Sequence, residues 1–468
     1  MTGEKEEIET TVSVNSKRSV RWHKSTWYNT TIVGLCQFLA PGLWNAMNSL
    51  GAGGLQDPVV VNTANAITFS LMFLTALFGS AIVRLIGVRN TLALGTVGYA
   101  PYSAALYCNS VYGTQWFVLF GAALCGLTAG IFWMVEAGIL LSYPEPEVRA
   151  KQMSYWLCFR VGGQLVGGAI NLGVSAHNTQ KGSISPKIYI IFITLQALGP
   201  FVAYFLTPPD KVERRDGKKV QLAADKSFFG ELISTLKYFA NLDFVFLIPF
   251  FAATVWSEAT SVTYIAEYFS VRARALGSFL SAICCMLSGY IEGILLDTKF
   301  WDNKTKKRSV YTGLAVIQGG IWVWSTINQQ KYTQEKPTFD WSSPGFGRAF
   351  ALYLFMAIGF QINYLFAFNI VGDIARTPAE IIRLAALVRG NESAAQAISY
   401  GLSSVESLIT VGISAVNFGV WGISILPAGY VVWKFGTQKY SRDSTDPGVV
   451  EITTGNDELK DNTNHAKI

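Results

Sequence analysis

The sequence predicts an all-α membrane protein, a bundle of twelve transmembrane helices arranged in two halves of six. Two apolar blocks, residues 28–206 and 244–435, flank a polar and basic stretch at residues 207–243. Each block divides into six apolar segments of roughly 18–25 residues, the length that a helix needs to cross about 30 Å of hydrocarbon. Charged residues make up 15% of the chain, whereas a soluble domain carries closer to a quarter. These observations exclude a large soluble protein and favour the two-halved body that is typical of transporters.

The apolar blocks and their flanks divide the chain into five parts. These are a cytoplasmic N-terminal tail (1–27), an N-terminal six-helix half (28–206), a cytoplasmic central linker (207–243), a C-terminal six-helix half (244–435) and a disordered cytoplasmic tail (436–468). The N-terminal tail has no apolar core, so we expect the first span to act as an anchor and no signal peptide to be cleaved. The spans are expected at residues 28–50, 61–83, 91–108, 114–141, 152–176, 188–206, 244–264, 276–296, 310–327, 349–371, 395–415 and 417–435.

The distribution of basic residues predicts the orientation. Most Lys and Arg residues lie in segments that face the cytoplasm if both termini lie inside, as the positive-inside rule requires. Arg160 is the one basic residue predicted within a span, and those predicted on the outer side are Lys181, Lys187, Arg272, Arg274, Lys331, Lys336 and Arg348. The sequons at Asn29, Asn303 and Asn391 fall on the cytoplasmic side, so none is expected to carry a glycan.

The central linker is expected to be partly helical from about residue 228. Its basic residues allow two interpretations: Lys211, Arg214, Arg215, Lys218 and Lys219. They can rest against anionic headgroups, each contributing on the order of 1 kcal/mol near the membrane surface. Alternatively, they form a solvated charge run that only enforces the topology.

The first span carries a polar face. Gln37, Pro41, Asn45 and Asn48 follow steps of four, four and three residues, so they lie along one side of a helix. Amides facing lipid are costly, so this face is expected to look into the bundle. Pro41 permits a kink. The polar face either forms contacts between packed helices or lines a cavity.

Four motifs carry a resemblance to a known family. They are APGLWNAMNSLGAGG at residues 40–54, YPEP at 143–146, RVGGQLVGGAIN at 160–171 and YGLSSV at 400–405. Together they resemble the Unc-ninety-three-like, or ion channel regulatory protein, branch of the major facilitator superfamily, and its fungal members most. The resemblance extends over nearly all of residues 28–435 and implies a major-facilitator-type fold with both termini in the cytoplasm. The family contains channel regulators or chaperones as well as presumed transporters, so it leaves the activity open.

One superfamily motif is incomplete. The usual loop after the second span reads G-x-x-x-D-R/K-x-G-R-R/K, and this chain has Gly79, Arg84, Gly87 and Arg89 but no Asp in residues 79–90. The missing acidic residue argues against ordinary gating through this loop. The eighth span keeps a degenerate copy, with Gly293, Asp297 and then the basic residues 306–308, as expected of a repeated half.

Two charged residues in the first half are predicted to form a buried ion pair. Glu136 lies about five residues, or roughly 7 Å, above the cytoplasmic end of the fourth span, and Arg160 lies about eight residues, or roughly 12 Å, above the same face on the fifth. Because a lone charge in the membrane is costly, pairing is expected. The pair is either a structural clamp between helices or a charge site that faces the cavity; Gln164 and Asn171 share the face of Arg160.

The second half carries further polar faces. Glu258 lies with Thr254 and Ser261 on the seventh span, and Glu292 follows Ser281, Cys285 and Ser288 along the eighth. A hydroxyl stripe is predicted on the eleventh span, at Ser399, Ser403, Ser407, Thr410 and Ser414. The candidates for substrate binding or for lining a cavity are Gln37, Asn45, Asn48, Glu136, Arg160, Gln164, Asn171, Glu258 and Glu292.

The sequence gives little support for enzymatic chemistry. The histidines, His23, His177 and His465, lie outside the spans, and neither a metalloprotease, a nucleotide-binding nor a hydrolase motif is present. The six cysteines have neither a disulfide nor a metal spacing. We therefore expect no catalytic residue, cofactor, metal or nucleic-acid partner. The expected function is alternating-access transport of a small polar or ionic solute across the lipid bilayer. The alternative is a non-transporting regulator or escort of another membrane protein, such as an ion channel.

Overall fold

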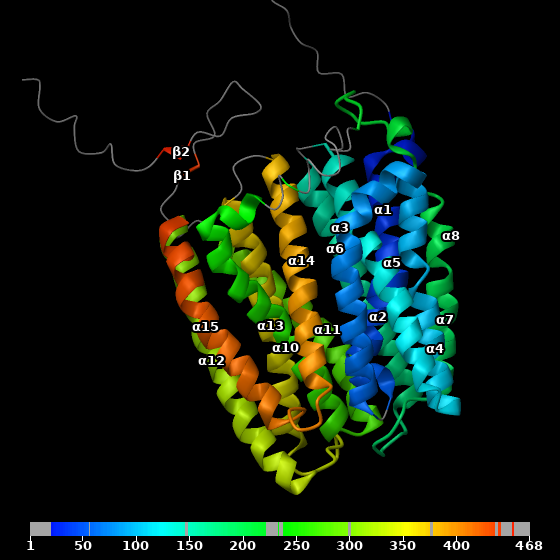
Figure 1. Cartoon of the computed structure of the whole chain (residues 1–468), viewed down its shortest axis with the longest axis vertical. Helices are drawn as coiled ribbons and strands as arrows, with labels where there is room; N and C mark the ends of the chain where they lie inside the picture. The colour runs from blue at the N-terminus through cyan, green and yellow to red at the C-terminus, as the bar shows by residue number, and fades with distance from the viewer. Residues whose placement is uncertain are drawn as a thin grey trace, which may run out of the picture.

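The computed structural model describes residues 20–220 and 237–435, apart from residues 56, 146–147, 298–300 and 375–377, together with residue 233 and two short strands. It is a bundle of long, roughly parallel helices (Figure 1). The strands β1 (Lys439–Tyr440) and β2 (Ile452–Thr453) pair antiparallel beyond the last helix. The linker helix predicted from about residue 228 and most of the two predicted tails lie outside the described residues.

The first span is built from three pieces: α1 (Thr26–Gln37), the π-helical turn η2 (Phe38–Gly42) and α2 (Leu43–Asn48). Pro41 lies in η2, because proline cannot donate the backbone hydrogen bond that a continuous α-helix needs. The other elements of the first half are η1 (Trp22–Lys24), η3 (Ala52–Gly54), α3 (Pro58–Thr96), α4 (Tyr99–Tyr112), α5 (Gln115–Ser142), α6 (Arg149–Ser175), α7 (Pro186–Ala197) and α8 (Gly199–Ala203).

The second half follows two short turns of the linker, η4 (Pro209–Lys211) and η5 (Lys237–Ala240). Its helices are α10 (Leu242–Tyr268), α11 (Val271–Asp297), α12 (Asn303–Glu335), α13 (Phe346–Ile374), α14 (Pro378–Ser403) and α15 (Val411–Phe435). Within the described part of the chain, nine helical stretches are long and apolar enough to cross a membrane. The remaining three segments of the twelve are the broken first span, the third span, which is shared between the end of α3 and α4, and the charged α14.

The two halves contact each other through α3 against α14 and through α6 against α11. Glycines permit the second contact, because a Cβ at Gly168 would lie 2.8 Å from the Cα atom of Phe279. The same helix packs closely on the first span: a Cβ at Gly163 would lie 2.7 Å from the carbonyl oxygen of Phe38. The glycines of α6 therefore let this helix approach both its own half and the other one.

The bundle has two different ends. We call the end where α1 begins and α15 finishes the tail end; Figure 1 shows both there. All described hydrogen bonds between the halves come from the other end, called the opposite end. There Asn62 donates to the Thr263 hydroxyl at 3.0 Å and to the Ser403 carbonyl at 2.9 Å, and Asn48 donates to the Tyr400 hydroxyl at 2.9 Å. The halves are therefore joined by directed polar contacts at the opposite end.

Arg274, the fourth residue of α11, adds further contacts between the halves at the opposite end. Arg274 is fully buried, and its guanidinium donates to the carbonyl oxygens of Leu50 and Gly51, both at 2.6 Å. It also donates to the carbonyls of Gly182 at 2.9 Å and Leu55 at 3.0 Å. One side chain of the second half thus holds two loops of the first half.

The predicted eleventh span, residues 395–415, is wrong. The helix α14 begins at Pro378 and ends at Ser403, and a turn separates it from α15. The prediction failed because charged residues such as Arg389 and Glu392 interrupt the apolar run, so the span was placed after them. The hydroxyl stripe is divided as a result: Ser414 lies on α15, where it hydrogen-bonds to Ser325 of α12 at 2.9 Å.

Three smaller expectations also need correction. Arg160 is not the one basic residue within a helical span, because Arg389 lies in α14 and Arg274 in α11, which begins five residues earlier than predicted. The sequon residue Asn391 lies inside α14, where it donates to the Ile248 carbonyl at 3.2 Å, and not in a cytoplasmic loop. The predicted loop after the second span is part of α3, which bends at Gly87, a residue with φ of 79°.

Candidate functional site

A cavity of about 210 Å³ lies between the two halves. Helices of both halves form its wall: η2, α2, α3, α4, α5 and α6 from the first, and α10, α11, α13 and α14 from the second. Its charged and amide side chains are Asn45, Arg160, Gln164, Glu258, Gln361, Arg389, Glu392 and Gln396. Both halves therefore contribute charged or amide side chains to one small space.

Arg389 and Glu392 form an ion pair on one face of α14. They are three residues apart on this helix, and Nη1 of Arg389 lies 3.0 Å from Oε2 of Glu392. Arg389 also donates to the hydroxyl of Tyr364 on α13. Glu392 is the more deeply buried partner, with 6% of its side chain exposed. Each of the two charges is therefore paired with an opposite charge on the same helix.

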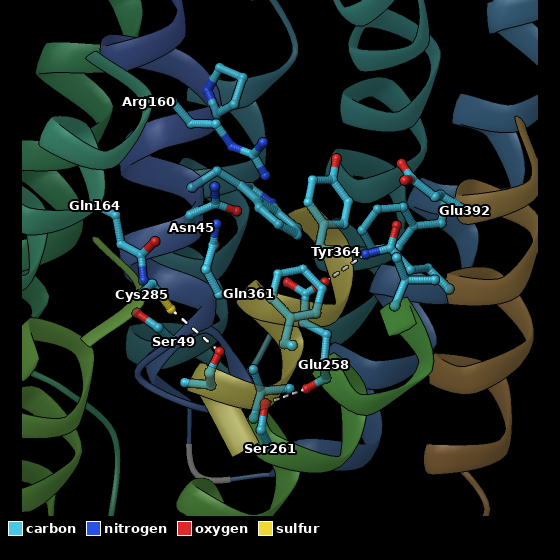
Figure 2. Close-up of a pocket in the computed structure, with 18 of the residues that line it drawn as sticks. Asn45, Ser49, Arg160, Gln164, Glu258, Ser261, Cys285, Gln361, Tyr364 and Glu392 are labelled. Carbon is cyan, nitrogen blue, oxygen red and sulfur yellow. Dashed lines mark hydrogen bonds between the residues drawn. The ribbon is translucent and has the colours of Figure 1, made fainter. Parts of the chain in front are cut away.

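Arg160 approaches the same aromatic rings from the other half. Its guanidinium carbon lies 5.4 Å from the ring centre of Trp133 and 5.7 Å from that of Tyr364. The guanidinium carbon of Arg389 lies 5.0 Å and 5.7 Å from these rings. Two aromatic faces thus lie beside two cations, and attraction between each cation and the rings offsets part of the cost of holding like charges close together. Figure 2 shows Tyr364 projecting between Arg160 and Glu392.

Glu258 of α10 is the second acidic group of the cavity. Its carboxylate accepts a hydrogen bond from the side-chain amide of Gln396 on α14 at 2.6 Å. Ser261, one turn along α10, donates to the backbone carbonyl of Glu258 at 2.9 Å. In Figure 2, Glu258 and Ser261 lie across the cavity from Arg160, Asn45 and Gln164.

The structure brings four of the nine candidate residues to this cavity and places five elsewhere. Asn45, Arg160, Gln164 and Glu258 line the wall. The other five are Gln37, Asn48, Glu136, Asn171 and Glu292.

Four of the five residues away from the wall form hydrogen bonds between helices: Gln37, Asn48, Glu136 and Asn171. Asn48 donates to Tyr400, and Asn171 donates to the Ala46 carbonyl at 3.3 Å, which joins α6 to α2. Glu292 is buried on α11, with neither carboxylate oxygen hydrogen-bonded.

The predicted ion pair between Glu136 and Arg160 is wrong. The Glu136 carboxylate accepts from the indole nitrogen of Trp156 at 2.7 Å, and the amide of Gln37, with its nitrogen towards Glu136, donates at 3.0 Å. Arg160 instead lies beside the aromatic rings of the cavity. The depth argument used only positions along each helix and could not give the direction of the side chains around each helix axis. The Glu136 carboxylate bonds to α6 through Trp156 and to α1 through Gln37, and Glu136 does not line the cavity.

Several cavity residues escaped prediction, above all Arg389, Glu392, Gln396, Gln361 and Tyr364. Arg389 and Glu392 lie in the part of α14 that was predicted to be a loop, and Gln396 lies at the start of the predicted eleventh span. One signal was available: Arg389 and Glu392 have the spacing of an ion pair on one helix face. A helix that neutralises its own charges in this way can enter a membrane despite low hydropathy.

Comparison with known proteins gives a consistent result. The model of the Major Facilitator Superfamily matches residues 27–390. The chain is 39% identical over 417 residues to the Notoamide biosynthesis cluster protein O′ of Aspergillus versicolor, covering 89% of this chain and 90% of that protein. It is 28% identical to an UNC93-like protein of Schizosaccharomyces pombe, covering 86% and 82%, and 24% identical to UNC93-like protein 1 of Arabidopsis thaliana, covering 82% and 86%.

Solved structures show the same fold. A D-xylose–proton symporter superposes with a TM-score of 0.62 at 11% identity, covering 88% of this chain and 98% of the symporter. A protein from a study of proton-dependent oligopeptide transporters superposes with a TM-score of 0.58 at 13% identity, covering 88% and 99%. At these identities the likeness concerns the fold alone.

Proposed function

The chain belongs to the UNC93-like branch of the major facilitator superfamily, and from this premise we propose that it carries a small polar or ionic solute across a membrane by alternating access. It is an integral, multi-pass membrane protein with a transporter-like fold. The observation that carries the proposal is the cavity, which takes charged side chains from both halves, as a site between two moving bodies requires. The proposal assigns no enzymatic reaction to the protein.

The position of the polar contacts between the halves supports alternating access. In this structure the described hydrogen bonds between the halves lie at the opposite end, and Arg274 alone makes four of them. The solute would exchange at the tail end in this state, and these bonds would break when the halves rock to the other state. With the tail end in the cytoplasm, as the distribution of basic residues predicts, this is an inward-facing arrangement.

Uptake into proteoliposomes tests the proposal. The purified full-length protein is reconstituted and offered a panel of labelled ions, sugars, organic acids, amines and amino acids. We expect uptake of at least one solute above protein-free vesicles, reduced in Arg160→Gln and unchanged in the surface variant Glu335→Gln, whose carboxylate pairs with Lys331 at 3.7 Å. A folded protein that takes up nothing from this panel would contradict transport.

A second candidate function is regulation or escort of another membrane protein. The observation that favours it is the missing acidic residue in residues 79–90, since Arg89 instead donates to the Leu206 carbonyl at 2.9 Å within its own half. This function predicts a folded protein that takes up no solute and copurifies with a membrane protein partner.

A further inference from the structure

We propose that the solute is a small zwitterion, such as an α-amino acid, whose anionic group binds Arg160 and whose cationic group binds Glu258. This inference rests on the proposed function, because it names the class of solute for the same cavity. It depends on which charges in the cavity have opposite charges beside them and which do not.

Of the four charged side chains that line the cavity, two neutralise each other. Arg389 and Glu392 are 3.0 Å apart on α14. The other two, Arg160 and Glu258, form no salt bridge with each other or with any group in the part of the chain that the structure describes. Glu258 accepts a hydrogen bond from Gln396, but a neutral amide does not cancel its charge. The buried Glu136 does not line the cavity and has its own donors, Trp156 and Gln37.

One cation of the first half, Arg160, and one anion of the second half, Glu258, therefore remain without a salt-bridge partner. An uncompensated charge inside a membrane is costly, so a solute that neutralises both is favoured over one that neutralises a single charge. A neutral sugar would leave both charges without a counter-charge. A simple anion would leave Glu258 without a counter-charge, and a simple amine would leave Arg160 without one. A zwitterion compensates both groups at once.

The surroundings of the two charges suit these partners. A guanidinium binds a carboxylate through two parallel hydrogen bonds, and the amides of Gln164 and Asn45 line the same side of the cavity. The cavity wall also includes the rings of Trp44, Phe69 and Phe360, which offer apolar surface to the remainder of the solute. The volume of about 210 Å³ limits the solute to a small molecule.

The two charges also belong to different moving parts. Arg160 is on α6 of the first half and Glu258 is on α10 of the second, so a bound zwitterion would connect the halves across the cavity. Binding would therefore favour a state in which the two halves lie closer together around the cavity. A ligand can shift such an equilibrium only through contacts that differ between the states, and this connection provides one.

A charge-matched binding series tests the proposal. The purified full-length protein is titrated with the twenty standard amino acids, with binding read as a change in melting temperature and then by calorimetry. Two derivatives of the tightest-binding amino acid are then tested. The amide of its carboxyl group carries only the positive charge, and the N-acetyl derivative carries only the negative charge. We expect each to bind about 30-fold or more weakly than the parent, since each loses a charge partner in the cavity.

Two variants show which residue recognises which group. In the Glu258→Gln variant, the N-acetyl anion should gain affinity relative to the parent amino acid. In the Arg160→Gln variant, the amide cation should gain affinity relative to the parent amino acid. A merely structural role would not reverse charge preference in this way. Matched controls are Glu335→Gln on the surface of α12 and Arg214→Gln in the linker, where Arg214 pairs with Asp216 at 2.6 Å. Both controls should keep the preference for the zwitterion.

The proposal is overturned if no amino acid binds, if either derivative binds as tightly as its parent, or if the two variants leave the preference unchanged. The uptake panel separates this failure from failure of the transport function. Uptake of a simple anion or cation without binding of amino acids would keep transport and reject the zwitterion. Binding of amino acids without uptake would keep the site and reject transport.

Discussion

Replacing Arg274 by methionine should release the opposite end of the bundle. Methionine keeps much of the length and apolar volume of arginine but has no hydrogen-bond donor. The variant loses donation to the carbonyls of Leu50 and Gly51, both at 2.6 Å, and to those of Gly182 and Leu55. All four acceptors lie in the other half of the protein.

The magnitude follows from these contacts. A hydrogen bond to a charged group contributes about 1.5–3 kcal/mol, so the two shortest bonds alone contribute about 3–6 kcal/mol. In the open state the guanidinium and the freed carbonyls recover bonds to water, which favours the lower figure. A change of about 3 kcal/mol corresponds to a shift of about 150-fold in the equilibrium between the closed and open states of this end.

The assay uses Cys285, which lines the cavity. The other five cysteines are replaced by serine, and a membrane-impermeant maleimide is added from the side of the opposite end. We expect slow labelling in the parent and much faster labelling in Arg274→Met. The matched control is Arg308→Met, because Arg308 donates to the Trp433 carbonyl at 2.5 Å within one half. Unchanged labelling in a folded Arg274→Met variant, or equal acceleration in the control, would refute the reasoning.

Three further predictions concern other sites. Arg389→Gln and Glu392→Gln should each lower the free energy of unfolding by about 3–5 kcal/mol and the double variant by less than their sum, measured by denaturation in detergent; additive losses would mean that the pair does not act as a unit. In the loop before α13, the Arg272 guanidinium holds the pKa of the Asp340 carboxyl well below its usual range. The stabilisation that Asp340 gives over Asp340→Asn should therefore be complete above pH of about 4 and decline as the pH falls further, as followed by melting temperature; a difference that persists at low pH would contradict this. Glycosylation mapping should find no glycan on Asn303, and a glycan there would overturn the cytoplasmic orientation of the tail end.

The two-halved fold could be predicted from the sequence because hydropathy responds to a constraint that acts on each span separately. Each lipid-facing helix must be long and apolar whatever its neighbours are. Positions along a helix were also predictable: Arg160 and Gln164 lie one turn apart and both reach the cavity. The choice of partner was not predictable, because it depends on how helices pack side by side. Glu136 faces inwards as expected, yet it bonds to Trp156 and Gln37 and leaves Arg160 to the aromatic rings.

The eleventh span was the hardest to predict for the same reason that α14 contributes so much to the cavity. A helix that lines a polar space between two halves must carry polar and charged residues, and these lower the hydropathy by which a span is recognised. In α14, Arg389 and Glu392 limit the cost by pairing with each other, and Gln396 reaches Glu258 on a neighbouring helix. A segment that is nearly as long as a span, and whose charges fall three or four residues apart, is therefore better predicted as a cavity-lining helix than as a loop.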